Sequence, residues 1–551
     1  MKQQDTLNAY IRQSITENWE LPALTDFKGG TFTYRDVARK VAKLHLLFEH
    51  AGLQPGDRIA LCGRNCAQWA IAAIASLTYG TVTVPILHDF KSDTVHHLVS
   101  HSEAKLLFTD SQTWENLDHD NMPHLKGVLL IHDYSLLFSR NKKLTEAREK
   151  LNKLFGERNP ERFVPSDVKY SDFEPERLAL INYTSGSMGF SKGVMVSYRS
   201  LWSNIQYSID GLSFLLPGDG TVCMLPLAHM FGLSIELLHP FVKGCHIYFL
   251  TRTPSPKIIM EAFAEVHPKL IIAVPLILEK IIRTRVFPLL NKPLMKVLMA
   301  IPGVDKHLLG KIKDQLEKTF GGQMKEIIIG GAPLNKDVEA FLRRIKFPYT
   351  VGYGMTECGP LVSYAPWEDI RPGSCGRIVD RMEARVDSPD PETVPGVLWV
   401  RGQNVMDGYY KNQEATSAVF DKEGWMNTGD IAQIDKDGFI YLRGRDKNMI
   451  LGPSGQNIYP EEIEQVLNNL PYVAESLIVS RDGSLVALIY PDLDNANKAG
   501  LDHTQLEKQM AENIKTLNGQ IPAYSQVSSY KLFDEEFEKT PKRSIKRYLY
   551  Q

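Results

Sequence analysis

Short apolar runs alternate with amphipathic segments through most of this chain, and this alternation limits the folds that are open to it. The strand-like runs are 58–61, 105–108, 127–131, 178–184, 221–225, 246–250, 270–274 and 326–329. Helical patterns lie between several of them, at 66–79, 257–266 and 335–345. Strands that alternate with helices predict layers of α/β structure with largely parallel sheets.

The pattern changes after about residue 395, where short β-rich runs precede a charged sequence at 443–448. With 551 residues the chain is too long for one hydrophobic core. We predict a large domain over 1–445 and a compact α+β domain over 446–551. In the second domain Pro460 opens a helix, and Thr504 with Glu507 is a candidate capping box for the last helix.

Residues 141–172 are charged and contain Pro160 and Pro165. The apolar positions Leu144, Leu151 and Leu154 indicate one surface helix. We interpret this segment as an excursion that carries no chemistry.

Composition excludes several functions. The 63 basic residues nearly cancel the 65 acidic ones, so no global field for nucleic acid or an anionic membrane is expected. Six scattered cysteines do not form a disulfide framework, which favours a reduced, cytoplasmic location. The chain has no signal-like start and no apolar run of about 18 residues, so we predict no transmembrane segment and at most peripheral membrane contact.

The most informative segment reads Tyr183-Thr-Ser-Gly-Ser-Met-Gly-Phe-Ser-Lys-Gly193. An apolar strand leads directly into a loop of hydroxyl side chains, glycines and one lysine. Glycine lets the backbone approach an anion, hydroxyls donate to phosphate oxygens, and lysine adds a positive charge. Taken alone, the loop is also compatible with a plain turn between two strands.

A P-loop needs the pattern G-x-x-x-x-G-K-[ST], and this loop does not satisfy it. Counting from Gly186, Ser191 stands where the second glycine should be, and Gly193 replaces the hydroxyl that would hold magnesium. Residues 193–196 also favour a strand, whereas a P-loop continues into a helix.

The loop resembles the phosphate-binding signature of the adenylate-forming superfamily, which contains acyl-CoA synthetases, nonribosomal-peptide adenylation domains and beetle luciferases. Met188 and Ser191 replace the threonine and proline that are usual there. Further motifs match in the same order, at 225–232, 330–334, 352–359, 425–430, 444–447 and 454–464, and the resemblance covers essentially the whole chain. It implies a large domain of layered α/β subdomains with a small β-barrel-like part, and a small C-terminal domain that rotates about a hinge near 446–447.

The resemblance also implies a nucleotide site. Its residues would be Thr184, Ser185, Gly186, Ser187, Gly189, Lys192, Gly331, Ala332, Pro333, Tyr353, Gly354, Asp430 and Arg445. Tyr353 would stack on adenine, and Gly331–Pro333 would lie against the same ring. Thr356 would contact the α-phosphate, and Glu357 with Thr184 would hold Mg²⁺. Asp430 would bind both ribose hydroxyls.

Two further positions concern the acid and the thiol. His229, in Leu225-Pro-Leu-Ala-His-Met-Phe-Gly232, would lie near the acyl pocket, although a core histidine is the plainer reading. Gly455 would let the pantetheine arm of coenzyme A pass close to the backbone.

The family commonly ends in P-[KR]-T-x-x-G-K, and this chain has Thr540-Pro-Lys-Arg-Ser-Ile-Lys546 with Ile545 in place of glycine. This spacing favours Lys546 as the catalytic lysine, with Lys542 as the alternative. Both also belong to a basic tail that could bind anions at a surface.

We therefore predict an enzyme, an AMP-forming acid–thiol ligase that uses ATP, Mg²⁺ and coenzyme A. The apolar stretch 230–238 favours a medium- or long-chain fatty acid as its substrate. The alternatives are a ligase that loads an acyl carrier protein, a mono-oxygenating luciferase, and a non-catalytic nucleotide-binding regulatory protein. Met188 and Ile545 keep the last of these open.

Overall fold

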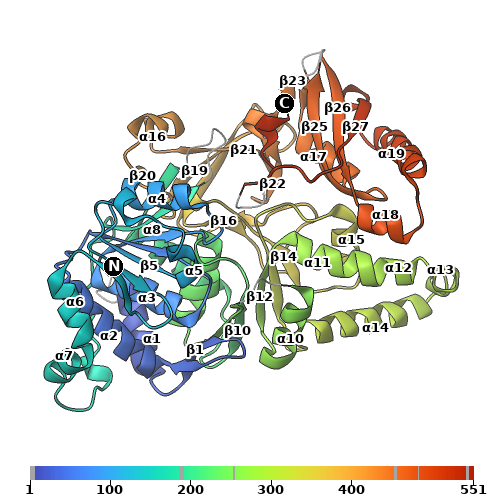
Figure 1. The fold of residues 1–551 in the computed structure, drawn as a ribbon. Coiled ribbons are helices and arrows are strands. Elements are labelled where there is room, and N and C mark those ends of the chain that lie inside the picture. The colour runs from blue at the N-terminus through green and yellow to red at the C-terminus, as the bar shows by residue number, and fades with distance from the viewer. Residues whose placement is uncertain are drawn as a thin grey trace. The chain divides into compact units, whose positions relative to one another are not determined.

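A computed structural model describes residues 6–184, 192–251, 255–451, 456–481, 483–540 and 545–550 (Figure 1). The chain divides into two compact units. Unit 1 contains residues up to 184, 192–383 and 401–418, and unit 2 contains 384–400 together with the chain from 419 onward. This division reflects which residues contact one another and says nothing about which parts move. The predicted domain boundary between 445 and 446 and the predicted hinge at 446–447 therefore stay predictions.

The largest sheet of unit 1 has eight strands in the order β20-β9-β8-β4-β3-β5-β6-β7. Their bounds are β3 Arg58–Cys62, β4 Val82–Ile86, β5 Leu106–Thr109, β6 Gly127–Leu130, β7 Leu136–Ser139, β8 Leu178–Thr184, β9 Lys192–Ser197 and β20 Gly408–Tyr409. The five strands from β8 to β6 in this order are parallel, and β9, β20 and β7 are antiparallel to their neighbours. Parallel strands covered on both faces read as continuous apolar runs, which is why the sequence predicted β3, β5, β6 and β8. β4, with threonine and proline among its residues, was missed.

The described part of unit 1 has three smaller sheets. Their orders are β10-β11-β1-β2, β12-β13-β14 and β15-β16-β17. The bounds are β1 Pro22–Asp26, β2 Thr31–Thr33, β10 Gly220–Cys223, β11 His246–Phe249, β12 Leu270–Ala273, β13 Glu326–Ile329, β14 Tyr349–Val351, β15 Tyr353–Gly354, β16 Leu361–Tyr364 and β17 Arg377–Ile378. The sheet of β12, β13 and β14 is parallel, so the carboxyl ends of its strands meet at one edge.

Helices cover these sheets. The longer ones of unit 1 are α1 Leu7–Glu17, α2 Tyr34–His50, α3 Ala67–Tyr79, α4 Ser92–His101, α8 Tyr198–Gly211, α10 Pro256–Val266, α14 Val304–Thr319 and α15 Lys336–Arg344. α3 is almost entirely buried, in keeping with its alanine-rich sequence, and Cys66 caps its first turn through its sulfur. Thr33 and Asp36 form a capping box at the start of α2.

The segment 141–172 contains two α-helices and a short 3-10 turn, Pro165–Asp167, where the sequence predicted one helix, and this prediction was wrong. α6 (Lys142–Glu149) and α7 (Leu151–Arg158) are separated at Lys150, whose backbone leaves the helical region. Both helices pack against α2, with Leu144 and Phe155 buried. Each short helix thus has its own buried apolar residue against α2, and this explains why the chain breaks between the two helices.

Unit 2 begins with the sheet β18-β19-β21-β22, which accounts for the predicted β-rich part. A second sheet, β25-β26-β27, packs with α17 and α19 around an apolar core. The bounds are β18 Met382–Asp387, β19 Gly396–Gly402, β21 Met426–Ile434, β22 Ile440–Arg445, α17 Pro460–Leu467, β25 Val473–Arg481, β26 Ser484–Pro491, α18 Leu493–Lys498, α19 His503–Asn518 and β27 Val527–Leu532.

The capping box of α19 lies two residues before the predicted one. Asp502 and Gln505 form it, not Thr504 and Glu507. An aspartate is as good an N-cap as threonine, and starting at Asp502 keeps Leu506 and Met510 in the core.

All six cysteines are free thiols, as predicted from their scatter. Among the described residues, we find no helix with both the length and the apolar character needed to cross a bilayer.

Candidate active site

Two predicted phosphate-binding residues face each other across β8 and β9. Thr184 ends β8 and pairs with Lys192, the first residue of β9. The Thr184 hydroxyl donates to the Lys192 carbonyl oxygen at 3.5 Å. The loop that joins them, with Ser185, Gly186, Ser187 and Gly189, lies outside the described residues. Its two ends are therefore held at one edge of the large sheet.

Tyr409 connects Lys192 with Glu357. It lies on β20, which pairs with β9, and its ring centroid is 4.7 Å from the Lys192 ammonium nitrogen. Its hydroxyl donates to Glu357 Oε1 at 3.0 Å. The backbone of Glu357 is fixed too, because its carbonyl oxygen accepts from the Met406 N–H at 2.8 Å. Sequence reasoning missed Tyr409, since only strand pairing brings it to this site.

Thr356 and Glu357 begin a 3-10 turn, Thr356–Cys358, that packs against β9. Both side chains are half-buried. Asn204 donates to the Cys358 carbonyl oxygen at 3.1 Å, and Ser234 donates to the Gly359 carbonyl oxygen at 3.0 Å. The turn is thus held from both sides beside the strand that carries Lys192.

The candidate adenine segment lies at the carboxyl end of the smaller parallel sheet. Gly331, Ala332 and Pro333 follow β13 and are exposed. The Gly352 N–H donates to the Ile329 carbonyl oxygen at 2.9 Å, which brings the start of the next motif to the same edge. Tyr353 is 8% exposed, so most of its ring is covered by protein, whereas Gly354 is exposed.

The His229 segment adjoins both of these edges. Asn182 on β8 donates to the Ala228 carbonyl oxygen at 2.9 Å. A Cβ added to Gly330 would lie 2.8 Å from Cε1 of Phe231, so any larger residue there would have to displace this ring. His229 itself is half-buried, and its N–H donates to the Pro226 carbonyl oxygen. Thr184, Lys192, Thr356, Glu357 and His229 are therefore parts of one connected region of unit 1.

Glu236 is a buried carboxyl that holds this segment and that sequence reasoning missed. It lies on a π-helical turn, Gly232–Leu238, and is 3% exposed. It accepts from the N–H groups of Met224 at 3.2 Å and Leu225 at 2.7 Å, and it lies 3.5 Å from the Cys223 sulfur. Burial raises the pKa of Glu236 to about 8, partly offset by these donors. A lone acid within an apolar stretch was the signal that could have identified it.

Asp430 and Arg445 pair within unit 2. They are opposite each other on β21 and β22, and Arg445 Nε lies 2.9 Å from Asp430 Oδ1. Asp430 is buried and Arg445 is exposed. A buried carboxylate with one charged partner can still accept hydrogen bonds from hydroxyl groups.

Lys546 also belongs to unit 2. Its ammonium lies 3.0 Å from Glu538 Oε2, and this hydrogen bond raises the pKa of the lysine. The neighbouring Arg547 forms an ion pair with the buried Glu464 at 2.6 Å, which holds the tail in place. Lys542 and Gly455 lie outside the described residues.

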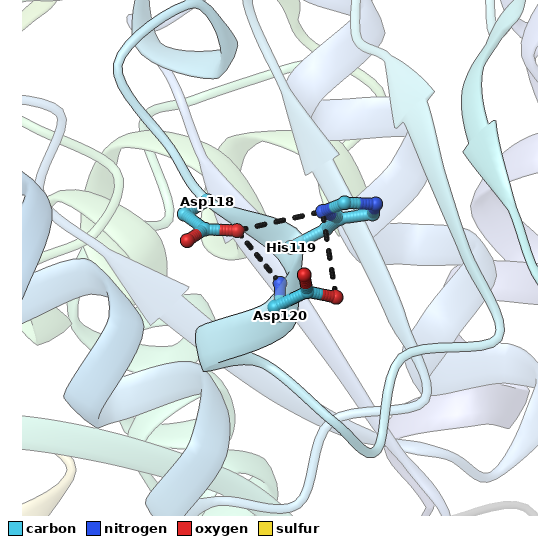
Figure 2. A group of neighbouring side chains, drawn as sticks. All are labelled: Asp118, His119 and Asp120. Carbon is cyan, nitrogen blue, oxygen red and sulfur yellow. Dashed lines mark hydrogen bonds and ion pairs between the residues drawn. The ribbon is translucent and has the colours of Figure 1, made fainter.

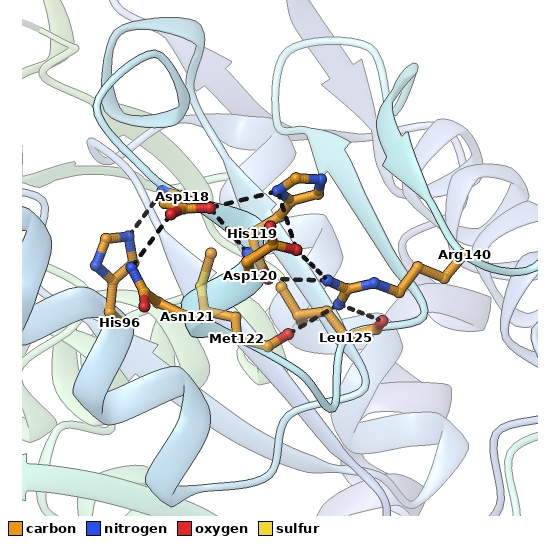
Figure 3. A network of polar contacts seen from close by, with 8 residues as sticks. All are labelled: His96, Asp118, His119, Asp120, Asn121, Met122, Leu125 and Arg140. Atoms are coloured by element: carbon orange, nitrogen blue, oxygen red, sulfur yellow. Dashed lines mark hydrogen bonds and ion pairs between the residues drawn. The ribbon is translucent and has the colours of Figure 1, made fainter.

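Among the residues that the structure describes, one group of potential metal ligands lies elsewhere in unit 1. Asp118, His119 and Asp120 bring one ligand atom each within 4.8 Å of one another (Figure 2). Asp118 caps the turn by accepting from the Asp120 N–H at 2.9 Å. Arg140 lies 3.3 Å from Asp120 and also binds the His119 carbonyl oxygen (Figure 3). Since the arginine supplies the positive charge, we interpret this group as a loop cap.

Comparison with known proteins identifies the family. The model of the AMP-binding enzyme family matches residues 11–410, and that of the AMP-binding enzyme C-terminal domain matches 447–550. The chain belongs to this family. The resemblance to the adenylate-forming superfamily and the α/β fold class are confirmed, as is the predicted enzyme class, an AMP-forming acid–CoA ligase.

The names of the relatives mention different acids as substrates. A 4-coumarate–CoA ligase 2 of Oryza sativa subsp. japonica is 28% identical over 82% of this chain and 76% of its own length. The peroxisomal long chain acyl-CoA synthetase 6 of Arabidopsis thaliana is 28% identical over 85% of this chain and 69% of its own.

Solved structures show the same fold. An anthranilate CoA ligase in complex with anthranoyl-AMP superposes with a TM-score of 0.78 at 17% identity, covering all of this chain and 97% of that one. The ATP-bound MatB of Rhodopseudomonas palustris gives 0.77 at 22% identity, covering 99% and 98%.

Replacing Tyr409 by phenylalanine removes the hydroxyl that donates to Glu357 but keeps the ring beside Lys192. A hydrogen bond to a charged group is worth roughly 1.5–3 kcal/mol, so we expect acid-dependent ATP–pyrophosphate exchange to fall about tenfold or more and to require more Mg²⁺. Tyr441→Phe, which removes a similar hydrogen bond to Asp435 in unit 2, is the control. Equal activity and equal Mg²⁺ demand in Tyr409→Phe and the native protein would contradict this role.

Glu236→Gln removes a titrating group from the interior. Because folding raises the pKa of Glu236 from 4.5 to about 8, its contribution to stability is full below the lower value and is lost as pH rises through the higher one. The native protein should therefore lose thermal stability relative to Glu236→Gln as pH rises from about 5 to about 9. The measurement is the unfolding midpoint across that range.

The matched control is Glu512→Gln, at an exposed position on α19. The difference between its unfolding midpoint and that of the native protein should not change with pH. A midpoint difference between Glu236→Gln and the native protein that does not change with pH would show that the buried carboxyl does not titrate in this range.

Proposed function

We propose that this protein converts a medium- or long-chain fatty acid into its acyl-CoA thioester in two steps, with an acyl-adenylate between them. One observation carries the proposal: the ends of the phosphate loop, the Thr356–Cys358 turn and the His229 segment form one connected region. An acid and the α-phosphate of ATP must meet where donors and an apolar wall adjoin, and this region supplies both.

In the first step an oxygen of the acid carboxylate attacks the α-phosphorus of ATP, and pyrophosphate leaves. Two anions approach each other, so the phosphate oxygens need positive charge and hydrogen-bond donors. Lys192 supplies charge at the start of β9, and Thr184 and Thr356 supply hydroxyls. Asp430 and Arg445 would hold the ribose and orient the nucleotide.

Glu357 and Thr184 are the residues proposed to hold Mg²⁺. Carboxylate and hydroxyl oxygens are the hard ligands that this ion prefers, and the half-buried Glu357 is oriented by the Tyr409 hydroxyl. When bound, Mg²⁺ would neutralise phosphate charge.

In the second step the thiol of coenzyme A attacks the carbonyl carbon of the adenylate, and AMP leaves. We propose that Lys546 acts in the first step only and Gly455 in the second, with a domain rotation about 446–447 between them.

The apolar segment that follows His229 supports a fatty acid. All seven residues of the turn Gly232–Leu238 are buried, and four of them are leucine or isoleucine. The names of several relatives favour a second candidate, an aromatic acid such as 4-coumarate.

The test is ATP–pyrophosphate exchange with short, medium, long and aromatic acids, with and without coenzyme A. The proposal predicts exchange with medium or long fatty acids and acyl-CoA when coenzyme A is added. Exchange with aromatic acids alone would select the second candidate. Exchange without a CoA product would indicate a carrier-protein ligase, and no exchange with any acid would contradict catalysis.

Lys546→Ala should slow acid-dependent exchange by about a hundredfold or more, because it removes a positive charge that would stabilise the anionic transition state. Thioester formation from synthetic acyl-adenylate should change little. Lys542→Ala tests the alternative residue, and Lys539→Ala, which removes an ion pair with Glu475, is the control. Loss of both half-reactions in Lys546→Ala would contradict its assignment to the first step.

A further inference from the structure

Residues 275–301 form a helical arm of unit 1. It consists of α11 (Pro275–Ile281), a π-helical turn (Ile282–Val286), α12 (Phe287–Leu290) and α13 (Pro293–Met299). Figure 1 shows α11 and α12 running alongside α14, with α13 at the end of this hairpin; α13 contacts both α12 and α14. We call this segment the 275–301 arm.

The arm exposes an unusual amount of apolar surface. Five large apolar side chains are 40–70% exposed: Leu276, Leu289, Leu294, Val297 and Ile301. Neither α12 nor α13 buries a residue. Across the other described residues, exposed large apolar side chains occur singly or as one neighbouring pair. Such a concentration indicates a surface that meets another apolar medium.

The spacing on α13 places two of these side chains together. Leu294 and Val297 are three residues apart on the helix, so they lie on one side of it, and Ile301 follows shortly after the helix ends at Met299. Helix α13 has seven residues, which at 1.5 Å per residue gives a length of about 10 Å. It is far too short to cross a bilayer, but it can lie along one.

The charge of the arm is strongly positive although the whole chain is close to neutral. It has five basic residues and one acidic residue. The basic ones are Lys280, Arg283, Arg285, Lys292 and Lys296. The acid, Glu279, faces inward, where its carboxylate accepts from the Asn335 N–H at 2.8 Å, and burial raises its pKa. The exposed side of the arm is therefore apolar and cationic.

We propose that the 275–301 arm docks this protein on the surface of an anionic phospholipid bilayer. The apolar side chains enter the boundary between headgroups and acyl chains. Lysine and arginine extend their aliphatic stems along that boundary and place their charges at the phosphates. This inference goes beyond the ligase activity and does not depend on which acid is activated.

A second copy of the chain fits this surface less well than a bilayer does. Two arms related by a twofold axis would bring Lys292 and Lys296 against the same cations of the partner copy, and like charges repel. An anionic lipid surface matches both properties of the arm at once.

The experiment is co-sedimentation of the full-length protein with vesicles of phosphatidylcholine alone and of phosphatidylcholine with phosphatidylglycerol. We expect binding to the anionic vesicles that weakens as salt rises. Lys292→Glu/Lys296→Glu should weaken it by about tenfold or more, because each basic residue near the surface contributes to binding. Leu294→Asp/Val297→Asp should weaken it to a similar degree, because it removes apolar contact with the bilayer and adds negative charge beside the anionic headgroups.

Matched controls separate the arm from general effects. Lys422→Glu/Lys436→Glu reverses two exposed charges elsewhere, and Leu216→Asp changes a leucine that is 56% exposed. Both should bind vesicles within about twofold of the native protein, since neither lies on the arm. All variants should keep the native thermal midpoint and ATP–pyrophosphate exchange.

Three results would overturn the proposal. The first is that the native protein fails to bind anionic vesicles, and the second is that the control variants weaken binding as much as the arm variants do. The third result is that the arm variants change only self-association, as measured by sedimentation velocity. The last would identify the arm as an interface between copies.

Discussion

The reversal of the chain after Thr184 is the constraint on which the candidate site depends. β8 runs parallel to its inner neighbour β4, and β9 returns beside β8 in the opposite direction, so Thr184 and Lys192 face each other. Because β20 pairs with β9, Tyr409 arrives next to Lys192 and reaches Glu357 with its hydroxyl. Strand pairing thereby positions Lys192 and Tyr409, and the Tyr409 hydroxyl in turn orients the Glu357 carboxylate on its 3-10 turn.

Buried polar groups hold the remaining segments against this edge. Asn182, Asn204, Ser234 and Glu236 are each buried, and each bonds to the backbone of a neighbouring segment. Burying such groups is costly unless their hydrogen bonds are made, so a segment that moved away would leave them unsatisfied. The low dielectric around them also explains the raised pKa of Glu236.

The sequence predicted much of the fold because buried parallel strands are continuous apolar runs, and 178–184 and 326–329 match their strands residue for residue. Motif residues such as Glu357 were proposed because the sequence around them resembles the ordered motifs of the adenylate-forming superfamily. Tyr409 and Glu236 were not, since strand pairing in one case and burial in the other give them their roles. The helix break at Lys150 and the N-cap at Asp502 were missed because helix ends depend on which residues pack against the rest of the fold, and the sequence does not show that packing.

The central claim, that the acid is activated as an adenylate, is tested most directly by following the acid's own oxygen. An acid that supports turnover is labelled with ¹⁸O in its carboxyl group and incubated with ATP, Mg²⁺ and coenzyme A, and the products are analysed by mass spectrometry. Attack of a carboxylate oxygen on the α-phosphorus predicts one labelled oxygen in AMP and none in pyrophosphate. Unlabelled AMP, or label in orthophosphate, would contradict the account.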